Sequence, residues 1–376
     1  MSRAEAAEAA AAVAAGAGTP GAAGHLVVAD SGSYASQGKR SAMEDAVLVT
    51  RLSLDIHPDQ TQAGNQQASG ASGGCSSGGG ALLAAVFDGH AGAGAAKFGA
   101  SRLPELVARA AASPGGIGAG GLDKAWRDLC GEWTRKADGS GAVATAAVVT
   151  TTPPAGGGGG GVVELRLVNC GDSRSLVLSL ERSPSTGRLL EVGVVWSTLD
   201  HRVDDPEELL RIARNRGTVA CAKGGMRLAV GDWRLAVPRA LTSPRWLRGG
   251  VSDEADSYTW RILDDSSDPD GPDGGGGGGR EVDGESSSDG GGKAYAGTWP
   301  GGGGSASDFA LVLASDGVWG VMGDEDVARC VAEALATENL DAQGAARKLC
   351  EEASRLGSQD NLSAALVYLR RSRTEL

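Results

Sequence analysis

The sequence has few features that would point to a membrane, a nucleic acid or a disulfide scaffold. Its 376 residues contain no apolar run of the roughly 18 residues that a membrane span needs, so we expect no spanning segment. Lys and Arg number 35 against 47 Asp and Glu, and no basic cluster could neutralise a row of phosphates. We therefore expect no nucleic acid partner.

Cysteine and histidine are also scarce, with six and four copies. The cysteines lie far apart without a CxxC pair, which argues against disulfides and a zinc site and predicts reduced thiols. We expect an intracellular monomer, in the cytoplasm or nucleus. The Ala-rich residues 1–24 contain Glu5 and Glu8 and match a transit peptide poorly. They are predicted to form a disordered tail, and import into an organelle stays an open alternative.

Glycine is abundant, but it is concentrated in four segments: 61–80, 111–121, 153–161 and 264–307. The last of these has nine acidic and two basic residues between Asp264 and Pro300, so it supplies −7 of the net charge of −12. With few large apolar side chains, it is predicted to remain an unfolded, solvated loop, and a regulatory or localising tether is the alternative. Residues 25–370 are thus predicted to form one domain that carries Gly-rich inserts.

Short apolar runs predict β-strands, and helical spacing predicts a smaller number of helices. The expected strands are 25–28, 45–51, 82–88, 142–152, 162–169, 175–180, 189–196, 309–315 and 363–369. The expected helices are 91–112, 122–135, 206–216, 325–336 and 341–356. Because several strands follow one another without an intervening helix, we expect mainly antiparallel sheets with helices covering their faces.

Five carboxylates stand at strand ends or turns, next to small residues: Glu44, Asp45, Asp88, Asp316 and Asp360. Each one alone could mark an ordinary turn. Together they form a set of oxygen ligands without Cys, which is what Mg²⁺ or Mn²⁺ prefers. Two such ions that share a carboxylate can lower the pKa of a bound water and stabilise charge on a phosphoryl group.

Two further side chains would complete such a site. Arg40 lies four residues before Glu44 and could bind a phosphate through two hydrogen bonds, although it could equally be a surface arginine. His90 follows Asp88 and Gly89 and could protonate a leaving oxygen, although a lone histidine is more often structural.

In their order, the motifs of the chain resemble those of the metal-dependent serine/threonine protein phosphatases of type 2C. The resemblance extends from about Gly38 to Leu369, outside the tail and the inserts. It rests on residues 38–45 (GKRSAMED), 87–92 (FDGHAG), 138–142 (DGSGA), 169–174 (NCGDSR), 199–201 (LDH), 235–241 (LAVPRAL), 313–319 (LASDGVW) and 357–361 (GSQDN). One such motif is weak, whereas eight in the order of the family are specific.

The resemblance implies an α+β fold, a four-layer α-β-β-α sandwich of two antiparallel sheets flanked by helices. It implies a binuclear Mg²⁺ or Mn²⁺ centre in which a metal-bridging hydroxide attacks phosphorus in line, so that phosphoserine and phosphothreonine in proteins are hydrolysed. By matching position, the resemblance assigns Asp88 as the bridge, Gly89 as a carbonyl ligand, Asp316 and Asp360 as ligands, Glu44 and Asp45 as ligands through water, Arg40 to the phosphate and His90 as the general acid.

The sequence departs from the family where a weaker third metal would bind. The family has an aspartate where this chain has Gly320, so only Asp200 of that third site is retained and a third ion is in doubt. A Gly-Asp turn of the family is replaced by Thr242 and Ser243. These changes motivate the alternative of a weakened or inactive relative that binds phosphoproteins, and we treat Asp172 as a structural turn residue. Hydrolysis of a small phosphate ester is a third possibility.

Overall fold

The computed structural model describes residues 26–52, 80–113, 116–117, 120–152, 162–183, 185–222, 224–263, 282–285, 293–300 and 307–371. The predicted tail 1–24, the insert 153–161 and all but the last residue of the insert 61–80 lie outside the described residues. No helix of the described part is long and apolar enough to cross a membrane.

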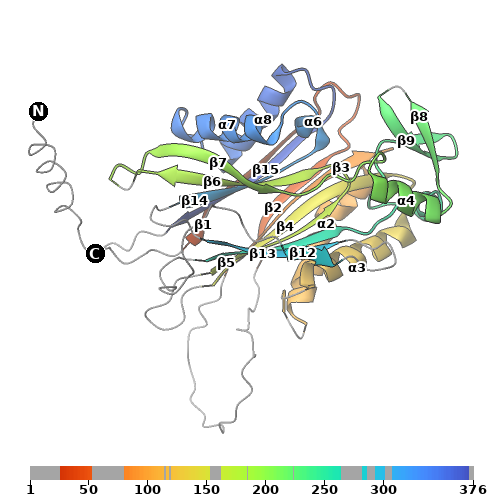
Figure 1. The fold of residues 1–376 in the computed structure, drawn as a ribbon, viewed down its shortest axis with the longest axis horizontal. Coiled ribbons are helices and arrows are strands. Elements are labelled where there is room, and N and C mark those ends of the chain that lie inside the picture. Colours follow the sequence, from red (N-terminus) through yellow and green to blue (C-terminus); the bar gives the residue numbers. More distant parts are fainter. Residues whose placement is uncertain are drawn as a thin grey trace, which may run out of the picture.

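Two large sheets form the centre of the molecule (Figure 1). In order across the first sheet, the strands are β1 (Leu26–Ser36), β15 (Leu362–Arg371), β14 (Ser307–Ala314), β6 (Arg174–Arg182) and β7 (Leu189–Ser197). The second sheet runs β12 (Val282–Glu285), β13 (Ala294–Pro300), β11 (Asp256–Leu263), β5 (Val162–Cys170), β4 (Gly141–Thr152), β3 (Ala81–His90) and β2 (Ala46–Leu52). Neighbouring strands are antiparallel except β11 and β13, which run parallel.

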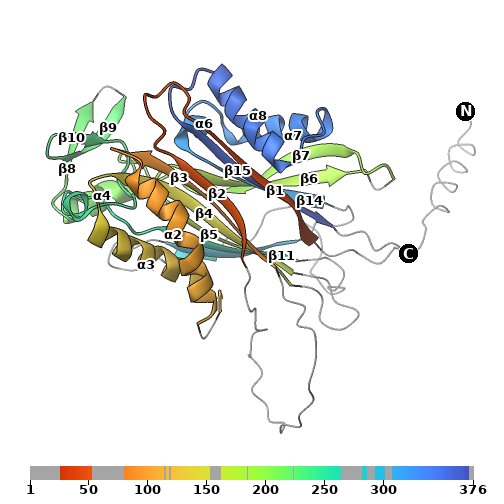
Figure 2. The same ribbon diagram turned by 180° about the vertical axis from the view of Figure 1, so that it is seen from behind.

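Helices cover the outer face of each sheet (Figures 1 and 2). Helices α2 (Gly94–Ala111) and α3 (Gly121–Lys136) pack on the second sheet, and α7 (Asp324–Ala336) and α8 (Ala342–Arg355) pack on the first. Three apolar clusters fill the spaces between these layers. Strand β3 lies in the middle of this arrangement, which explains why its sequence is apolar almost throughout rather than alternating. The predicted α+β sandwich of four layers is confirmed.

The expected strands and helices are all present, with small shifts at their ends. Position 25 of the first strand lies outside the described residues, and that strand continues to Ser36. The expectation that residues 264–307 stay unfolded is wrong for β12 and β13. Strand β13 pairs along β11, and the ring of Tyr295 stacks on Tyr258 with centroids 4.8 Å apart. A neighbouring strand thus supplies the apolar contact that the segment cannot supply for itself.

A small sheet beside α4 (Pro206–Arg214) forms a subdomain at one end of the sandwich (Figures 1 and 2). Its strands are β8 (Thr218–Ala222), β9 (Gly225–Val230) and β10 (Trp233–Leu235). We call residues 206–235 the flap. Asp205 begins α4, because its side chain accepts a hydrogen bond of 2.7 Å from the Glu207 amide and Pro206 occupies the first turn.

A buried ion network ties the flap to the sandwich. Glu208 of α4 accepts hydrogen bonds from Arg211 at 2.9 Å and from Arg239 at 2.7 Å. Arg239 also donates to Asp256 at the start of β11, at 3.1 Å. Burial alone would raise the pKa of Glu208, but the guanidinium groups of Arg239 and Arg211 hold that pKa below its ordinary value. The chain then returns to β4, where Leu241 and Ala142 exchange backbone hydrogen bonds.

We expect Glu208→Gln to lower the stability of the folded protein by about 3 kcal/mol at pH 7, because it leaves buried Arg211 without a carboxylate and buried Arg239 with Asp256 alone. The difference from wild type should shrink below about pH 4.3, the ordinary glutamate value, and vanish once the pH passes the lowered folded pKa. Chemical denaturation of both proteins across this pH range measures the difference in their free energies of unfolding.

The matched control is Glu207→Gln, one residue earlier. Glu207 is 67% exposed and pairs with Lys293 on the surface, so its loss should cost no more than about 1 kcal/mol. Equal effects of the two variants at pH 7 would contradict a special role for the buried network.

Candidate metal and phosphate site

Four of the predicted carboxylates converge at one end of the two sheets. Asp45 directly precedes β2 and Asp88 lies near the end of the adjacent β3, where Ala46 is opposite Phe87. Asp316 begins the short helix α6 (Asp316–Trp319) directly after β14. Asp360 stands just before β15, which pairs with β14. Antiparallel pairing therefore brings residues from distant parts of the chain together.

Asn361 holds the loop that precedes Asp45 against this end of the sheets. Its amide nitrogen donates to the carbonyl oxygens of Gln37 at 2.7 Å and Ala42 at 2.9 Å, and its oxygen accepts from the Glu44 amide at 2.8 Å. The side chain is buried and has both its donor and acceptor groups satisfied. Asn361 was part of a motif in the sequence, but its positioning role follows only from these contacts.

The clustered carboxylates destabilise one another's charges. Burial raises the pKa of Asp88 well above its ordinary value, and the charges of Asp316 and Asp45 raise it further. Burial likewise raises the pKa of Asp45 to about 6, against the lowering effect of a 2.8 Å hydrogen bond from Ser363. The pKa of Asp316 is raised by burial and also by Asp360. The site therefore has more negative charge than the surrounding protein balances.

Asp172 also belongs to this cluster, although the sequence led us to treat it as a structural turn residue. It lies in the turn between β5 and β6, beside the ends of β4 and β14. Burial and the charge of Asp316 raise its pKa to about 8, and its own charge raises the pKa of Asp88. An Asp after Gly in a tight turn gave no signal that could separate it from ordinary turn residues.

Arg40 is the cation that faces the cluster from the loop before β2. Its guanidinium forms an ion pair with Asp360, and 54% of its side chain remains exposed. Partial burial would lower the pKa of Arg40, but the charges of Asp360, Asp316 and Asp88 raise it instead. Arg40 is therefore held charged at the open edge of the carboxylate cluster, and its predicted binding of a phosphate stays a prediction.

Gly89 lies where the backbone of β3 and the backbone at Glu44 come closer together than a side chain would permit. A Cβ atom there would lie 2.2 Å from the carbonyl oxygen of Glu44, so only glycine allows β3 and the Glu44 loop to come this close. The backbone of Glu44 is thus placed beside Asp88 and Gly89. Its half-buried side chain forms no hydrogen bond or ion pair among the described residues.

His90 is less closely connected to the cluster than its position in the sequence implied. Its ring stacks on Trp246, with centroids 5.0 Å apart, and its Nε2 atom lies against Gly141. That nitrogen is buried and has no hydrogen-bond partner among the described residues. Burial lowers the pKa of His90 to about 4, so the ring is neutral at pH 7 in this conformation. The structure therefore places His90 beside the cluster, on the side of the flap.

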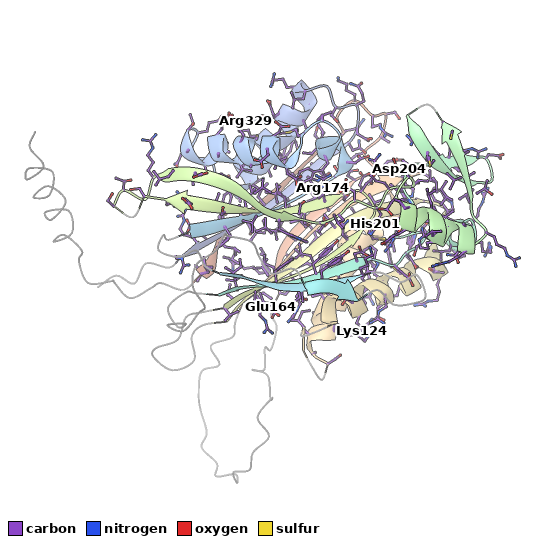
Figure 3. The ribbon with its side chains drawn as sticks, viewed as in Figure 1. Lys124, Glu164, Arg174, His201, Asp204 and Arg329 are labelled. Atoms are coloured by element: carbon purple, nitrogen blue, oxygen red, sulfur yellow. The ribbon has the colours of Figure 1, made fainter. Side chains whose placement is uncertain are left out.

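Asp200 is engaged by Arg174, which the sequence had left outside the site. The guanidinium of Arg174 donates two hydrogen bonds to Asp200, at 2.9 and 2.7 Å, and a third to Asp324 at 2.5 Å. It also lies over the ring of Trp319. In Figure 3, Arg174 lies toward the flap end of the sandwich, and so do His201 and Asp204. Both oxygens of the Asp200 carboxylate are thus paired with Arg174, at the position where the sequence left a third metal in doubt.

The donor chemistry of the cluster suits hard divalent cations, because carboxylates and a close-packed backbone carbonyl are oxygen ligands. In the conformation seen, no three His, Cys, Asp or Glu side chains among the described residues are arranged to hold a metal ion. Instead, Asp88 shares a hydrogen bond with Asp316, and Arg40 pairs with Asp360. The residues fit the cations in chemistry and charge, and these side chains must turn to bind them.

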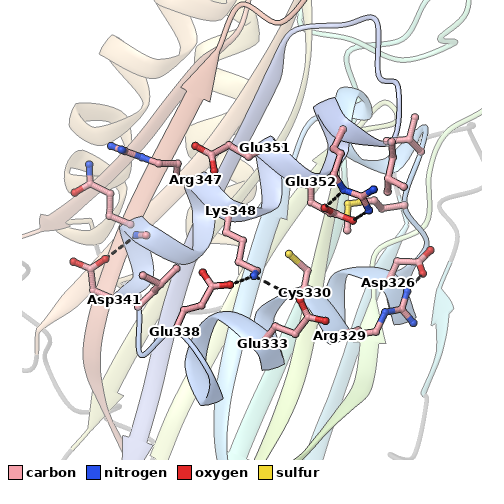
Figure 4. A pocket seen from close by; sticks show the side chains of 17 residues that line it. Asp326, Arg329, Cys330, Glu333, Glu338, Asp341, Arg347, Lys348, Glu351 and Glu352 are labelled. Atoms are coloured by element: carbon pink, nitrogen blue, oxygen red, sulfur yellow. Dashed lines mark hydrogen bonds and ion pairs between the residues drawn. The ribbon is translucent and has the colours of Figure 1, made fainter.

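A second region of interest, a pocket of about 1110 Å³, lies between α7 and α8, away from the carboxylates (Figure 4). Its charged side chains largely pair with one another: Lys348 with Glu333 and Glu338, and Arg355 with Glu352. All four of its basic residues are engaged, since Arg329 pairs with Asp326 and Arg347 lies over the ring of Tyr34, so the groove offers no free cation to a phosphate.

The sequence is similar to those of known protein phosphatases. A family model described as protein phosphatase 2C matches residues 61–267 and 304–362. "Probable protein phosphatase 1N" of Mus musculus is 33% identical over 217 residues, which cover 56% of this chain and 41% of that protein. "Probable protein phosphatase 2C 76" of Arabidopsis thaliana is 45% identical over 65 residues, which cover 17% and 14%. The chain thus spans less than half the length of these curated relatives.

Solved structures show the same fold. A serine-threonine phosphatase 2C from Toxoplasma gondii aligns with a TM-score of 0.53 at 19% identity, covering 94% of this chain and 96% of that one. A phosphatase from a pathogenic strain of Toxoplasma gondii aligns with a TM-score of 0.57 at 16% identity, covering 93% and 97%. With the family model matching more than half of its residues, the chain belongs to the protein phosphatase 2C family.

Proposed function

We propose that this protein hydrolyses phosphoserine and phosphothreonine in proteins with the help of two Mg²⁺ or Mn²⁺ ions. The observation that carries the proposal is the cluster of Asp45, Asp88, Asp316 and Asp360, whose charge is not balanced by the protein, with Arg40 at its edge. A carboxylate set of this kind favours bound cations, and an arginine at its edge favours a phosphate.

In this proposal, Asp88, the Gly89 carbonyl, Asp316 and Asp360 would hold the two ions directly, with Asp88 as the shared ligand. Glu44 and Asp45 would help to hold them through water molecules, and Ser363 fixes the Asp45 carboxylate with a hydrogen bond of 2.8 Å. When bound, the ions would neutralise the carboxylates and the phosphate and would lower the pKa of the attacking water. A phosphoprotein-binding scaffold would not need these carboxylates together with Arg40 and His90.

Arg40 and His90 act on the substrate. Arg40 releases Asp360 and binds two oxygens of the phosphate, which orients phosphorus for in-line attack. His90 protonates the leaving serine or threonine oxygen. Because burial holds its pKa near 4 in the free protein, this role requires the negative charge of the bound phosphate to raise that pKa.

The alternative of a non-catalytic phosphoprotein-binding relative rests on the departures at Gly320, Thr242 and Ser243. The last two side chains are buried, and their segment pairs with β4, so this departure lies in a packed part of the protein rather than in the cluster. Hydrolysis of small phosphate esters would use the same cluster and differs only in substrate.

We expect Asp88→Asn to reduce the Mn²⁺-dependent release of phosphate from a phosphothreonine peptide by more than about 100-fold, because the shared ligand is lost. Chelator should abolish the wild-type activity. The control is Asp204→Asn, which removes one surface carboxylate paired with Arg202 and should leave the rate unchanged.

Three outcomes separate the candidate functions. No metal-dependent release by the wild type would exclude the phosphatase. Binding of the phosphopeptide without release would support the non-catalytic alternative. Release from an aryl phosphate but not from any phosphopeptide would support hydrolysis of small esters.

We expect His90→Ala to slow hydrolysis of an alkyl phosphoester by about 10²-fold or more, while an activated aryl phosphate is affected far less. The aryl leaving group departs without a proton, so only the alkyl substrate needs the acid. Single-turnover rates on both substrates measure this. An equal loss on the two substrates would reject the general-acid role.

We expect two, and not three, tightly held Mn²⁺ ions per chain, because Arg174 already occupies the carboxylate of Asp200. Isothermal titration gives the stoichiometry. Asp200→Asn should leave it at two, whereas a third ion that disappears in this variant would contradict the proposed arrangement.

A further inference from the structure

Beside His90, on the side of the flap, a pocket of about 680 Å³ opens at the surface. Ala91, which follows His90, lines this pocket, and so does Trp246, whose ring stacks on His90. Trp246 in turn contacts the ring of Trp233, with centroids 5.8 Å apart, and 46% of Trp233 is exposed. A continuous run of aromatic rings therefore connects the pocket with the candidate catalytic histidine.

The pocket is strongly basic in a chain whose net charge is −12. It is lined by Arg135 and Lys136 from the end of α3 and by Arg245 and Arg248 around the short helix α5 (Pro244–Leu247). All four are exposed. Arg135, Arg245 and Arg248 form no ion pair among the described residues, and Lys136 lies over the ring of Phe98.

The one carboxylate of the lining does not neutralise these cations. Asp138 accepts hydrogen bonds from the amide of Ser140 at 2.9 Å and from its hydroxyl at 2.6 Å. The same carboxylate lies against Gly94 at the start of α2. One carboxylate stands against four cations in the lining, so the pocket retains an excess of positive charge.

The helix dipole explains the positions of only two of the four basic residues. Arg135 and Lys136 lie in the last turn of α3, where basic residues favourably oppose the helix dipole. Arg245 and Arg248 have no such explanation, since α5 has only four residues. Two unpaired arginines beside exposed tryptophan are the residues expected to bind an anionic peptide group.

We propose that this pocket is a substrate subsite that binds an aspartate or glutamate side chain close to the phosphorylated residue. The inference rests on the proposed function, since it is the leaving serine or threonine that must lie beside His90. The flanking peptide would then pass over Trp246 into the pocket. The acidic character of the whole chain disfavours acidic peptides, so a preference for them must arise at this pocket.

The test is binding of two fluorescent peptides that carry a non-hydrolysable phosphonate analogue of phosphothreonine, one flanked by Asp and the other by Ser. By anisotropy, the full chain should bind the Asp peptide at least about tenfold more tightly at low salt, and the difference should shrink at about 0.5 M salt. The double variant Arg245→Ala with Arg248→Ala should bind both peptides equally.

The matched control is Arg214→Ala, which removes an exposed arginine of the flap outside the pocket and should keep the preference. Equal binding of the two peptides by wild type, a preference that survives in the double variant, or its loss in Arg214→Ala would each overturn the subsite. A preference for a second phosphorylated residue with none for Asp would overturn the carboxylate assignment.

Hydrolysis of an aryl phosphate with Mn²⁺ separates this inference from the proposed function. The double variant should hydrolyse it at the wild-type rate, which also shows that the variant folds. If wild type fails to hydrolyse it while binding the Asp peptide selectively, the proposed function fails and the subsite stands. If wild type hydrolyses the aryl phosphate but binds the two peptides equally, the subsite fails and the proposed function stands.

Discussion

Electrostatic repulsion among aspartates at one end of the sandwich is the constraint on which the rest of the site depends. Packing between the sheets and their helices holds Asp45, Asp88 and Asp316 together although burial and mutual repulsion raise their pKa values. Without a compensating charge this arrangement costs stability, as strained functional sites commonly do. Arg40 pairs with Asp360 at the edge of this charge, and Gly89 allows the Glu44 loop to lie close to β3.

The molecule contains a second group of buried charges that behaves in the opposite way. Where the flap meets the sandwich, Glu208 lies between Arg211 and Arg239, and its pKa is lowered because its charge is compensated. This complete network anchors an element, whereas the incomplete aspartate cluster favours ligands from outside. Burial is common to the two groups, so the balance of charge, and not burial, distinguishes the structural network from the candidate site.

The segment that follows the flap connects the candidate site with the proposed substrate subsite. The segment that departs from the family pattern, around Thr242 and Ser243, is packed against the start of β4 and leads directly into α5. There Trp246 contacts His90 on one side and borders the basic pocket on the other. A change in this segment would therefore act on the proposed subsite more directly than on the carboxylates.

The fold and the carboxylates were accessible from the sequence because both are local signals: apolar runs mark β3 and β14, and an Asp beside Gly marks each strand end. The ordered part of the insert was missed because β13 acquires its apolar contacts from Tyr258 on β11. Asp172 and the neutral state of His90 depend on neighbours that are distant in the sequence. The sequence by itself thus determined where the candidate carboxylates stand in the chain, and tertiary structure decided their charges and partners, because pKa and pairing depend on distance in space.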